Sequence, residues 1–431
     1  MELTERTLST MGILEKIKSN YLAFFLGILS FVTFVYVHPG DSLLKVIFSD
    51  PMGYYQYLPA IFIEHNLKDM EYTVPLENGN MLSVFHIGIA LLQLPFFLIS
   101  HLIVLISGGE ANGYSAIYMY GVGAAASFYL AVGVYFLQKF LMNFYAKSSI
   151  LIALLIVVFG TNLFYYSAFQ AGMSHVYSFA GFAALIYLSH LFFKKINFRL
   201  AALIGFLVGV IIVIKPNNGI IVFFLIFYGL TSFSEVLPRI KWWLKQWKFV
   251  LVMFCFGGVV LFLQMAYFKH VSGNWLEFSY GHLGQQFFWT KAQMGKVLFS
   301  PQNGFFIYAP AMLFAVIGLI WGSFRKQANF FTSLLIWCLS WYIFASWWCW
   351  WFGGAYGHRA FIEYLPLLAI GLTYFIQEIS KVTVLKYLGV TIGFAFVFVS
   401  VRMSFIYVSP WDGPEWGWDD YLVQLGHVFW V

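Results

Sequence analysis

The chain has 431 residues, of which 61% are hydrophobic and 10% are charged. A soluble protein of this length cannot bury so much apolar surface, so the composition excludes a soluble globular protein and indicates a polytopic membrane protein. The formal net charge of +6 does not indicate nucleic-acid binding, because the basic residues lie in short loops between apolar segments.

Apolar segments along the chain predict an all-α protein with about eleven transmembrane helices in a single domain, residues 1–431. Residues 1–20 are typical of a short amphipathic cytoplasmic lead, and Tyr21 to Val37 form the first predicted span. The later predicted spans are residues 114–137, 149–168, 173–193, 200–216, 218–233, 249–268, 305–322, 329–346, 361–378 and 387–407.

The segment 82–106 is also apolar, but we expect it not to cross the membrane. If it stays outside, thirteen basic residues of the later loops fall on the cytoplasmic side and six fall outside, whereas the count reverses if it crosses. The excess of basic residues on the cytoplasmic side of membrane proteins therefore favours a segment that lies along the outer leaflet. This topology places the N-terminus in the cytoplasm and the C-terminus outside.

With this topology the long loops all lie on the external face. They are residues 38–113, 269–304, 347–360 and the tail 408–431. The first external loop is expected to carry two juxtamembrane helices. Polar, aromatic and acidic residues gather in these loops, so we expect the function on the external face.

The first informative stretch is Phe48 to Phe62, FSDPMGYYQYLPAIF. Asp50 lies at the predicted membrane boundary, where a partly desolvated carboxylate can act as a base. Tyr54 and Tyr55 follow on an apolar segment and are candidate substrate-binding residues. The alternative is an Asp-Pro turn that leads into a tyrosine-rich interfacial anchor.

The second informative stretch is Ser346 to Pro366, SWWCWWFGGAYGHRAFIEYLP. A tryptophan cluster and three glycines precede His358 and Arg359 at the start of a predicted span. An arginine at this depth needs an anionic partner, and the two candidates are Glu363, four residues later, and a lipid phosphate. The first would be a helix pair beside a tryptophan belt, and the second would be a binding site that includes His358.

Other polar residues are expected at the outer ends of spans. Lys215 either extends to the interface or forms a second phosphate contact. His175 either binds a sugar hydroxyl or belongs to a polar cap. Further substrate-binding candidates on the external face are His86, Gln170, His282 and Glu363. The ten histidines show no metal-ligand spacing, so we expect no obligatory metal ion, and a divalent cation is left open.

The chain resembles the GT-C class of polytopic glycosyltransferases, especially bacterial relatives of protein O-mannosyltransferases and of lipid A aminoarabinose transferases. The resemblance rests on SDPMGYYQYLPAIF in the first external loop, on FHIGIALLQLPFF after it, and on the late block WWCWWFGGAYGHRAFIEYLP. His358 stands where many of these proteins have proline. Asp50 stands alone where many carry paired acidic residues, which weakens a metal-dependent reading.

The resemblance implies transfer of a sugar from a polyprenyl-phosphate-linked donor to a glycan, lipid or protein acceptor at the external face of a bacterial inner membrane. Asp50 would be the general base, and Arg359 and Lys215, with His358 beside them, would bind the donor phosphate. Two alternatives from other classes are a transporter or flippase of lipid-linked or small amphipathic substrates and a non-catalytic membrane scaffold.

Overall fold

The computed structural model describes residues 21–406 and 416–430. These residues form helices and loops, apart from one short antiparallel hairpin that pairs β1 (Val74–Pro75) with β2 (Met81–Leu82). The predicted all-α class is therefore confirmed. The predicted cytoplasmic lead, residues 1–20, and part of the predicted tail, residues 408–415, lie outside the described residues.

Six helices among the described residues are long and apolar enough to cross a membrane, so the protein is an integral membrane protein. A seventh candidate results if α2 (Tyr21–Val37) is joined to the sharply bent η1 (Gly40–Ile47). The six are α5 (Gly88–Ser107), α6 (Ala116–Leu141), α9 (His175–Lys194), α13 (Trp247–Val271), η6 (Arg359–Tyr364) with α18 (Leu365–Ile379), and α19 (Thr383–Ile406).

Eleven spans are not shown, because several predicted spans are short or broken helices. Gly160 ends one of these helices, and Pro310 separates two others. The shorter apolar elements are α7 (Lys147–Phe159), α8 (Leu163–Ala168), α10 (Phe198–Ile214), η2 (Pro216–Ile221), α11 (Val222–Ile226), α15 (Phe305–Tyr308), α16 (Ala311–Phe324) and α17 (Phe330–Ser346).

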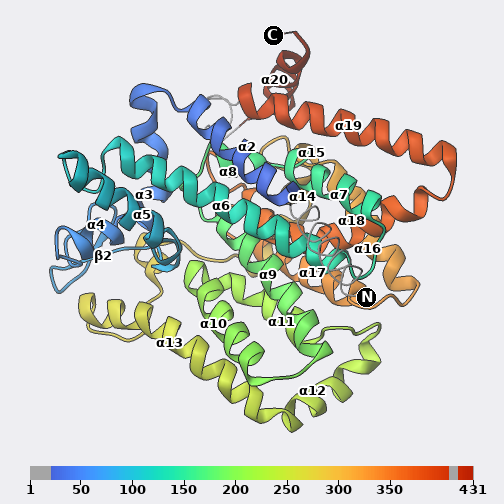
Figure 1. The fold of residues 1–431 in the computed structure, drawn as a ribbon, viewed down its shortest axis with the longest axis horizontal. Helices are drawn as coiled ribbons and strands as arrows, with labels where there is room; N and C mark the ends of the chain where they lie inside the picture. The colour runs from blue at the N-terminus through green and yellow to red at the C-terminus, as the bar shows by residue number, and fades with distance from the viewer. Residues whose placement is uncertain (1–20, 407–415, 431) are drawn as a thin grey trace, which may run out of the picture.

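The centre of the molecule is built on α6, which packs between α2 and α9 (Figure 1). Small residues allow α2 to approach α6 closely: a Cβ atom on Gly27 would lie 2.9 Å from Ala131 Cβ. At the same contact the Ser127 hydroxyl donates to Ser30 Oγ at 3.2 Å. Tight packing of small residues is a main source of helix association in a membrane.

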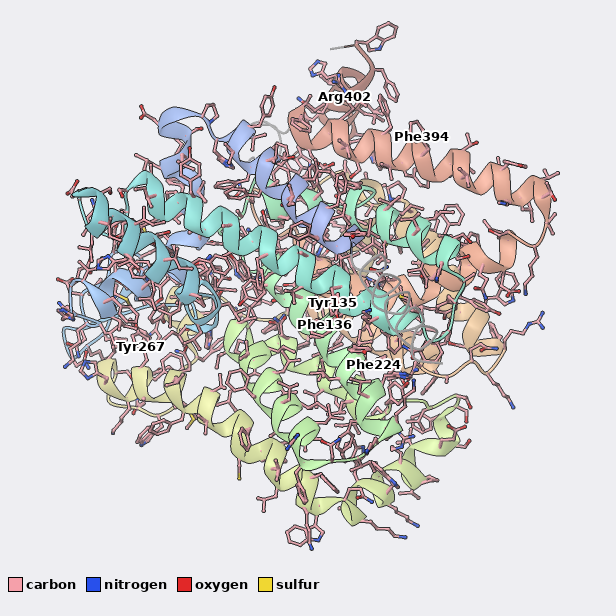
Figure 2. All side chains as sticks on the ribbon, in the orientation of Figure 1. Tyr135, Phe136, Phe224, Tyr267, Phe394 and Arg402 are labelled. Atoms are coloured by element: carbon pink, nitrogen blue, oxygen red, sulfur yellow. The ribbon has the colours of Figure 1, made fainter. Side chains whose placement is uncertain are left out.

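Helices α10 and α13 form a second closely packed pair at the lower edge of Figure 1. The helices run in the same direction, since Gly205 meets Met253 and Gly209 meets Gly257. The chain returns between them through α11, η3 (Phe233–Glu235) and α12 (Val236–Lys245). In Figure 2 Tyr267, near the end of α13, lies beside the segment 38–113, where its ring is 5.0 Å from that of Tyr57.

Residues 38–113, predicted as the first external loop, are folded against the body. The stretch that contains Asp50 forms two short helices, α3 (Asp50–Tyr55) and α4 (Tyr57–Phe62), and is not one exposed amphipathic helix. The Tyr55 hydroxyl donates to the Gly113 carbonyl at 2.5 Å, and the Tyr57 hydroxyl donates to the Phe85 carbonyl at 2.6 Å. The segment expected to hold the second juxtamembrane helix, residues 82–106, forms α5, which is one of the six candidate spans.

The C-terminal part places η6 and α18 in the interior. Backbone meets backbone where Gly318 of α16 crosses Gly371 of α18. Helix α19 lies at the edge of the molecule (Figure 1). Only 11% of its most apolar 18-residue stretch is buried. The remaining elements are η4 (Ser279–Leu283), η5 (Trp289–Lys291), α14 (Met294–Phe299) and α20 (Trp418–Trp430).

Candidate active site

Five ionisable side chains from distant parts of the chain meet in what we call the ion cluster. Asp50 begins α3, His175 begins α9, Lys215 follows α10, and Arg359 and Glu363 belong to η6. Arg359 Nη2 lies 3.0 Å from Asp50 Oδ2. Glu363 Oε1 lies 3.1 Å from Lys215 Nζ and 3.0 Å from His175 Nδ1. With a neutral histidine, the two acidic and two basic groups cancel.

Asp50 is held by a strained turn. Ser49, directly before it, has a φ of 67° and a ψ of −130°. This is a sparsely populated conformation for a residue other than glycine and costs ~1–3 kcal/mol. Pro51 follows at the start of α3, and the turn before α9 packs on it so closely that a Cβ on Gly172 would lie 2.6 Å from Pro51 Cβ. The surrounding packing therefore fixes the position of Asp50.

Arg359 is placed by the glycine-rich turn before it. Gly357 has a φ of +65°, and a Cβ atom there would lie 2.8 Å from Tyr308 Cβ, so both the conformation and the space favour glycine. The Arg359 side chain is 18% exposed and the Asp50 side chain is 27% exposed. The ion pair is therefore partly open to the surroundings.

Glu363 is enclosed more fully, with only 2% of its side chain exposed. A buried carboxylate is costly unless it is paired, and Lys215 supplies the pairing charge. The Lys215 side chain is 20% exposed.

The contacts of His175 define its tautomer. Nδ1 faces the Glu363 carboxylate, so it carries the proton and donates. Lys215 Nζ lies 3.5 Å from the same nitrogen, which therefore cannot also accept from the lysine. Nε2 is left as an acceptor, and it is buried without a partner among the described residues. His175 is thus a neutral side chain oriented by Glu363.

Phenol groups surround the ion cluster. The Ser174 hydroxyl donates to the Tyr54 hydroxyl at 3.4 Å, and Tyr166 accepts from the Tyr356 N–H at 3.2 Å. Burial raises the pKa of Tyr54 and of Tyr280 well above the ordinary value, and the nearby Asp50 carboxylate acts in the same direction. These phenols remain neutral and can act as hydrogen-bond donors.

The prediction that Arg359 pairs with Glu363 is wrong, since each has another partner. The physical reason is the helix type. Residues four apart lie on one side of an α-helix, but η6 is a 3₁₀-helix, in which residues three apart are aligned. The alternative of Lys215 as a lysine that only extends to the interface is also wrong, because its amine pairs with Glu363.

Two predicted site residues neighbour the ion cluster in sequence but turn away from it. Tyr55 is 2% exposed, and its hydroxyl donates to the Gly113 carbonyl. His358 is 1% exposed, and its Nε2 lies 3.0 Å from the Trp350 carbonyl. Burial lowers the pKa of His358 to about 3, so the ring is neutral and adds no positive charge for a phosphate. The structure does not bring either side chain into the cluster.

Three further predicted residues lie at other places on the fold. His86 packs edge-on against Phe268, and burial lowers its pKa to about 4. His282 lies on η4, 3.4 Å from Glu277. Gln170 lies in the turn between α8 and α9 and is partly buried. Their predicted contacts with substrate stay predictions.

Sequence reasoning missed Tyr166, Tyr280 and Met173 as neighbours of the ion cluster. Met173 Sδ lies 4.0 Å from Arg359 Nη1. Tyr280 comes from the loop 269–304, where only its place in FSYGHLG beside a glycine marks it. Its neighbours in space are remote in sequence, so no local pattern could have identified it.

Among the residues that the structure describes, no three His, Cys, Asp or Glu side chains are grouped so that they could hold a metal ion. Comparison of the chain with models of protein families, with curated proteins and with solved structures found no match. The case for a function therefore rests on the ion cluster and its surroundings.

Proposed function

We propose that the protein is a membrane glycosyltransferase that moves a sugar from a polyprenyl-phosphate-linked donor to an acceptor at the external face of a bacterial inner membrane. The single observation that carries the proposal is the pairing of Asp50 with Arg359 at 3.0 Å. It joins a carboxylate from the first external loop to a cation from the late glycine-rich block. These are two of the three stretches on which the resemblance to GT-C enzymes rests.

The cations of the ion cluster suit a lipid-linked phosphate. Arg359 has five N–H donors, and its Nη2 donates to Asp50 Oδ2. Its partly exposed guanidinium, with Lys215 beside it, can accept a phosphate group. These groups would stabilise the negative charge that grows on the departing phosphate.

Asp50 would act as the base. Its Oδ2 accepts from Arg359, and Oδ1 accepts no hydrogen bond from the described residues. The acceptor hydroxyl gives its proton to Oδ1 and forms a new bond to the anomeric carbon of the sugar. The bond from that carbon to the phosphate oxygen breaks, and its electron pair leaves with the polyprenyl phosphate. Tyr54 and Tyr280 would donate hydrogen bonds to the sugar.

The buried ion pair favours a second candidate function, a transporter or flippase. Charged side chains inside membrane proteins often mark a transport pathway. Glu363 and Lys215 form such a pair. The glycosyltransferase is favoured because Asp50, the more exposed carboxylate of the ion cluster, would supply a base beside a partly exposed guanidinium that would bind phosphate.

The proposal includes eleven spans, a cytoplasmic N-terminus and an external α5. The contacts that the two halves of α6 make with other helices support this placement of α5. Its C-terminal half packs on α9, with Gly133 against Phe179, whereas its N-terminal half packs on α5, with Tyr118 against His101. Helix α5 starts against Ile214 at the end of α10 and leads away from the layer that contains α9 and α10.

Impermeant thiol labelling in intact cells tests this topology. Single cysteines at Asn112 and Asn274, in a background without the native cysteines, should both react. Length and composition place α5 among the candidate spans, so labelling of Asn274 without Asn112 would show that α5 crosses.

The function is tested by identifying the lipids that copurify with the protein. Mass spectrometry of the extracted lipids should detect a sugar linked through phosphate to a polyprenol, and the purified protein should release the polyprenyl phosphate when acceptor is added. Absence of any sugar-phosphate lipid, together with lipid translocation in proteoliposomes, would contradict the proposal and support the flippase.

A further inference from the structure

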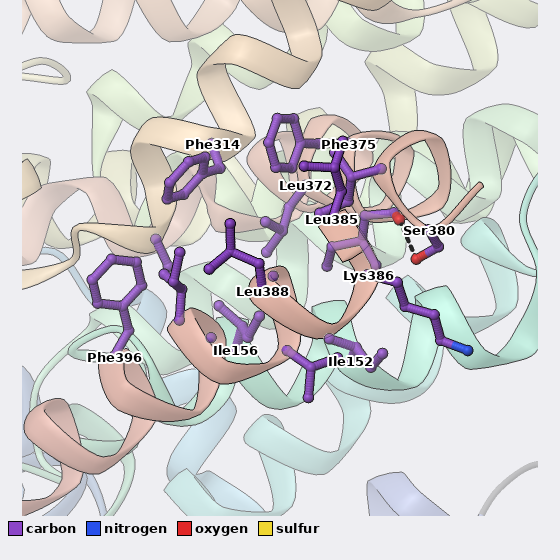
Figure 3. Close-up of a pocket in the computed structure, with 17 residues that line it drawn as sticks. Ile152, Ile156, Phe314, Leu372, Phe375, Ser380, Leu385, Lys386, Leu388 and Phe396 are labelled. Carbon is purple, nitrogen blue, oxygen red and sulfur yellow. Dashed lines mark hydrogen bonds between the residues drawn. The ribbon is translucent and has the colours of Figure 1, made fainter. Parts of the chain in front are cut away.

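A groove separates α19 from the body of the protein, away from the ion cluster. It contains about 780 Å³ of space, part of which is open to the surroundings. Side chains from α7, α16, α18 and α19 line it (Figure 3). Most of them are aliphatic or aromatic, so the groove suits a hydrocarbon chain better than a polar solute.

Two glycines of α19 mark where this helix approaches the body of the protein closely. Gly389 and Gly393 lie one turn apart on the side of α19 that lines the groove. A Cβ atom on Gly393 would lie 3.1 Å from Ile156 Cδ1, and one on Gly389 would lie 2.7 Å from Ile379 Cδ1. The opposite wall is aromatic, with the Phe314 and Phe375 rings 5.2 Å apart.

One end of the groove is basic. Figure 3 shows Phe396 at one end and Lys386 at the other, with the lysine amine directed away from the apolar lining. Lys386 is exposed and forms no ion pair with any described residue. Lys381, five residues earlier, differs because its amine lies 2.6 Å from Glu378 Oε1. Lys386 is therefore available to bind an anion that is not part of the protein.

The basic end lies far from the ion cluster. Ser400 of α19 accepts from the Tyr356 hydroxyl, in the glycine-rich turn that leads to Arg359. Lys386 precedes Ser400 by fourteen residues, which is about 21 Å along a helix at 1.5 Å per residue. An anion at Lys386 is therefore held at the opposite end of α19 from the level of the candidate active site.

We infer that this groove binds an acyl chain of an anionic phospholipid, with the lipid phosphate held by Lys386. The neighbours on α19 support a lipid over a protein segment, because Val384, Phe394 and Phe398 are exposed apolar side chains on the same helix. The apolar lining receives the chain, and the single unpaired amine at its end matches one phosphate charge. This inference is independent of the proposed reaction.

Photocrosslinking in nanodiscs tests it. The probes are phosphatidylglycerol and phosphatidylcholine, each with a diazirine on one acyl chain, and the crosslinked residues are mapped by mass spectrometry. We expect crosslinks at Leu388 and Phe396. The anionic lipid should give about fivefold more, the factor that corresponds to ~1 kcal/mol for one lysine beside an anionic lipid.

Two pairs of variants separate the contributions of chain and headgroup. Gly393→Leu should fill the groove and remove the crosslinks, whereas Gly258→Leu on α13, where an added Cβ meets nothing within 4 Å, should not. Lys386→Gln should abolish the anionic preference, whereas Lys381→Gln should keep it. Because Lys386 is exposed, its variant is expected to fold. Equal crosslinking by both lipids in the unaltered protein, or an unchanged preference in Lys386→Gln, would overturn the inference.

Discussion

The two ion pairs of the candidate site differ in their access to the surroundings. Asp50 and Arg359 are 27% and 18% exposed, whereas Glu363 is 2% exposed and has two partners on one oxygen. A partly exposed pair gains little stability from its contact and can exchange a partner for a ligand. A buried pair cannot lose one member without leaving the other charge uncompensated. In the proposed reaction Asp50 and Arg359 would therefore act directly, whereas Glu363 would position Lys215 and His175.

The largest expected effect on stability is that of Glu363→Gln. The change keeps the shape of the side chain but leaves the Lys215 charge without its partner, and such losses typically cost ~3–5 kcal/mol. Thermal unfolding of the purified protein should show a large decrease in Tm. The matched control is Glu378→Gln, which breaks a pair whose lysine is 64% exposed and should change the stability by at most ~1 kcal/mol. Equal effects of the two variants would contradict the distinction.

The second prediction concerns Arg359→Lys, which keeps the charge and removes the planar fork. We expect a roughly 10²-fold loss of sugar transfer, the range for loss of one preorganised donor to a developing charge. Thermal stability should change little, because the pair is partly exposed. A variant that transfers sugar normally would remove Arg359 from the phosphate site.

Variants in which two charged residues exchange places test the observed pairing of Arg359 with Asp50. Exchange of Arg359 with Glu363 should not restore folding or activity, because it places Arg beside Lys215 and Glu beside Asp50. Exchange of Asp50 with Arg359 keeps an ion pair and should preserve folding while transfer is lost. Recovery of transfer in the first double variant would contradict the observed pairing.

A smaller effect is expected from the histidines outside the ion cluster. Burial lowers the pKa of His86 to about 4, below the ordinary value of 6.5. Below pH 6.5 the unfolded chain binds a proton that the folded protein does not bind, so the free energy of unfolding falls as pH decreases toward about 4. The slope is at most ~1.4 kcal/mol per pH unit for one histidine. His86→Gln should flatten the dependence of Tm on pH in this range, and an unchanged slope would contradict the assignment.

Hydropathy was sufficient to predict the fold class, because an apolar segment in a membrane must satisfy its backbone polar groups within a helix. It could not locate the breaks in the helices. Residues 149–168 were predicted as one span, but Gly160 and the following turn divide them into α7 and α8. Such breaks depend on packing with helices that are distant in sequence.

The candidate site was predictable in composition but not in connectivity. Asp50, Arg359, Lys215, His175 and Glu363 were all identified from the sequence as site residues. The contact between Asp50 and Arg359 joins residues 309 positions apart, and no local pattern reveals it. The local inference of an Arg359–Glu363 pair assumed α-helical spacing and failed because this turn is a 3₁₀-helix.

The most direct test of the account is the rate of sugar transfer by Asp50→Asn. Asparagine keeps the shape of the side chain but cannot accept the proton, and general-base catalysis typically contributes ~10²–10⁴-fold. Asp41→Asn, on the exposed side of η1, is the matched control and should keep nearly normal turnover. With equal amounts of folded protein and bound donor, the account predicts a loss of this size for Asp50→Asn alone. Near-normal turnover by Asp50→Asn would contradict the central claim.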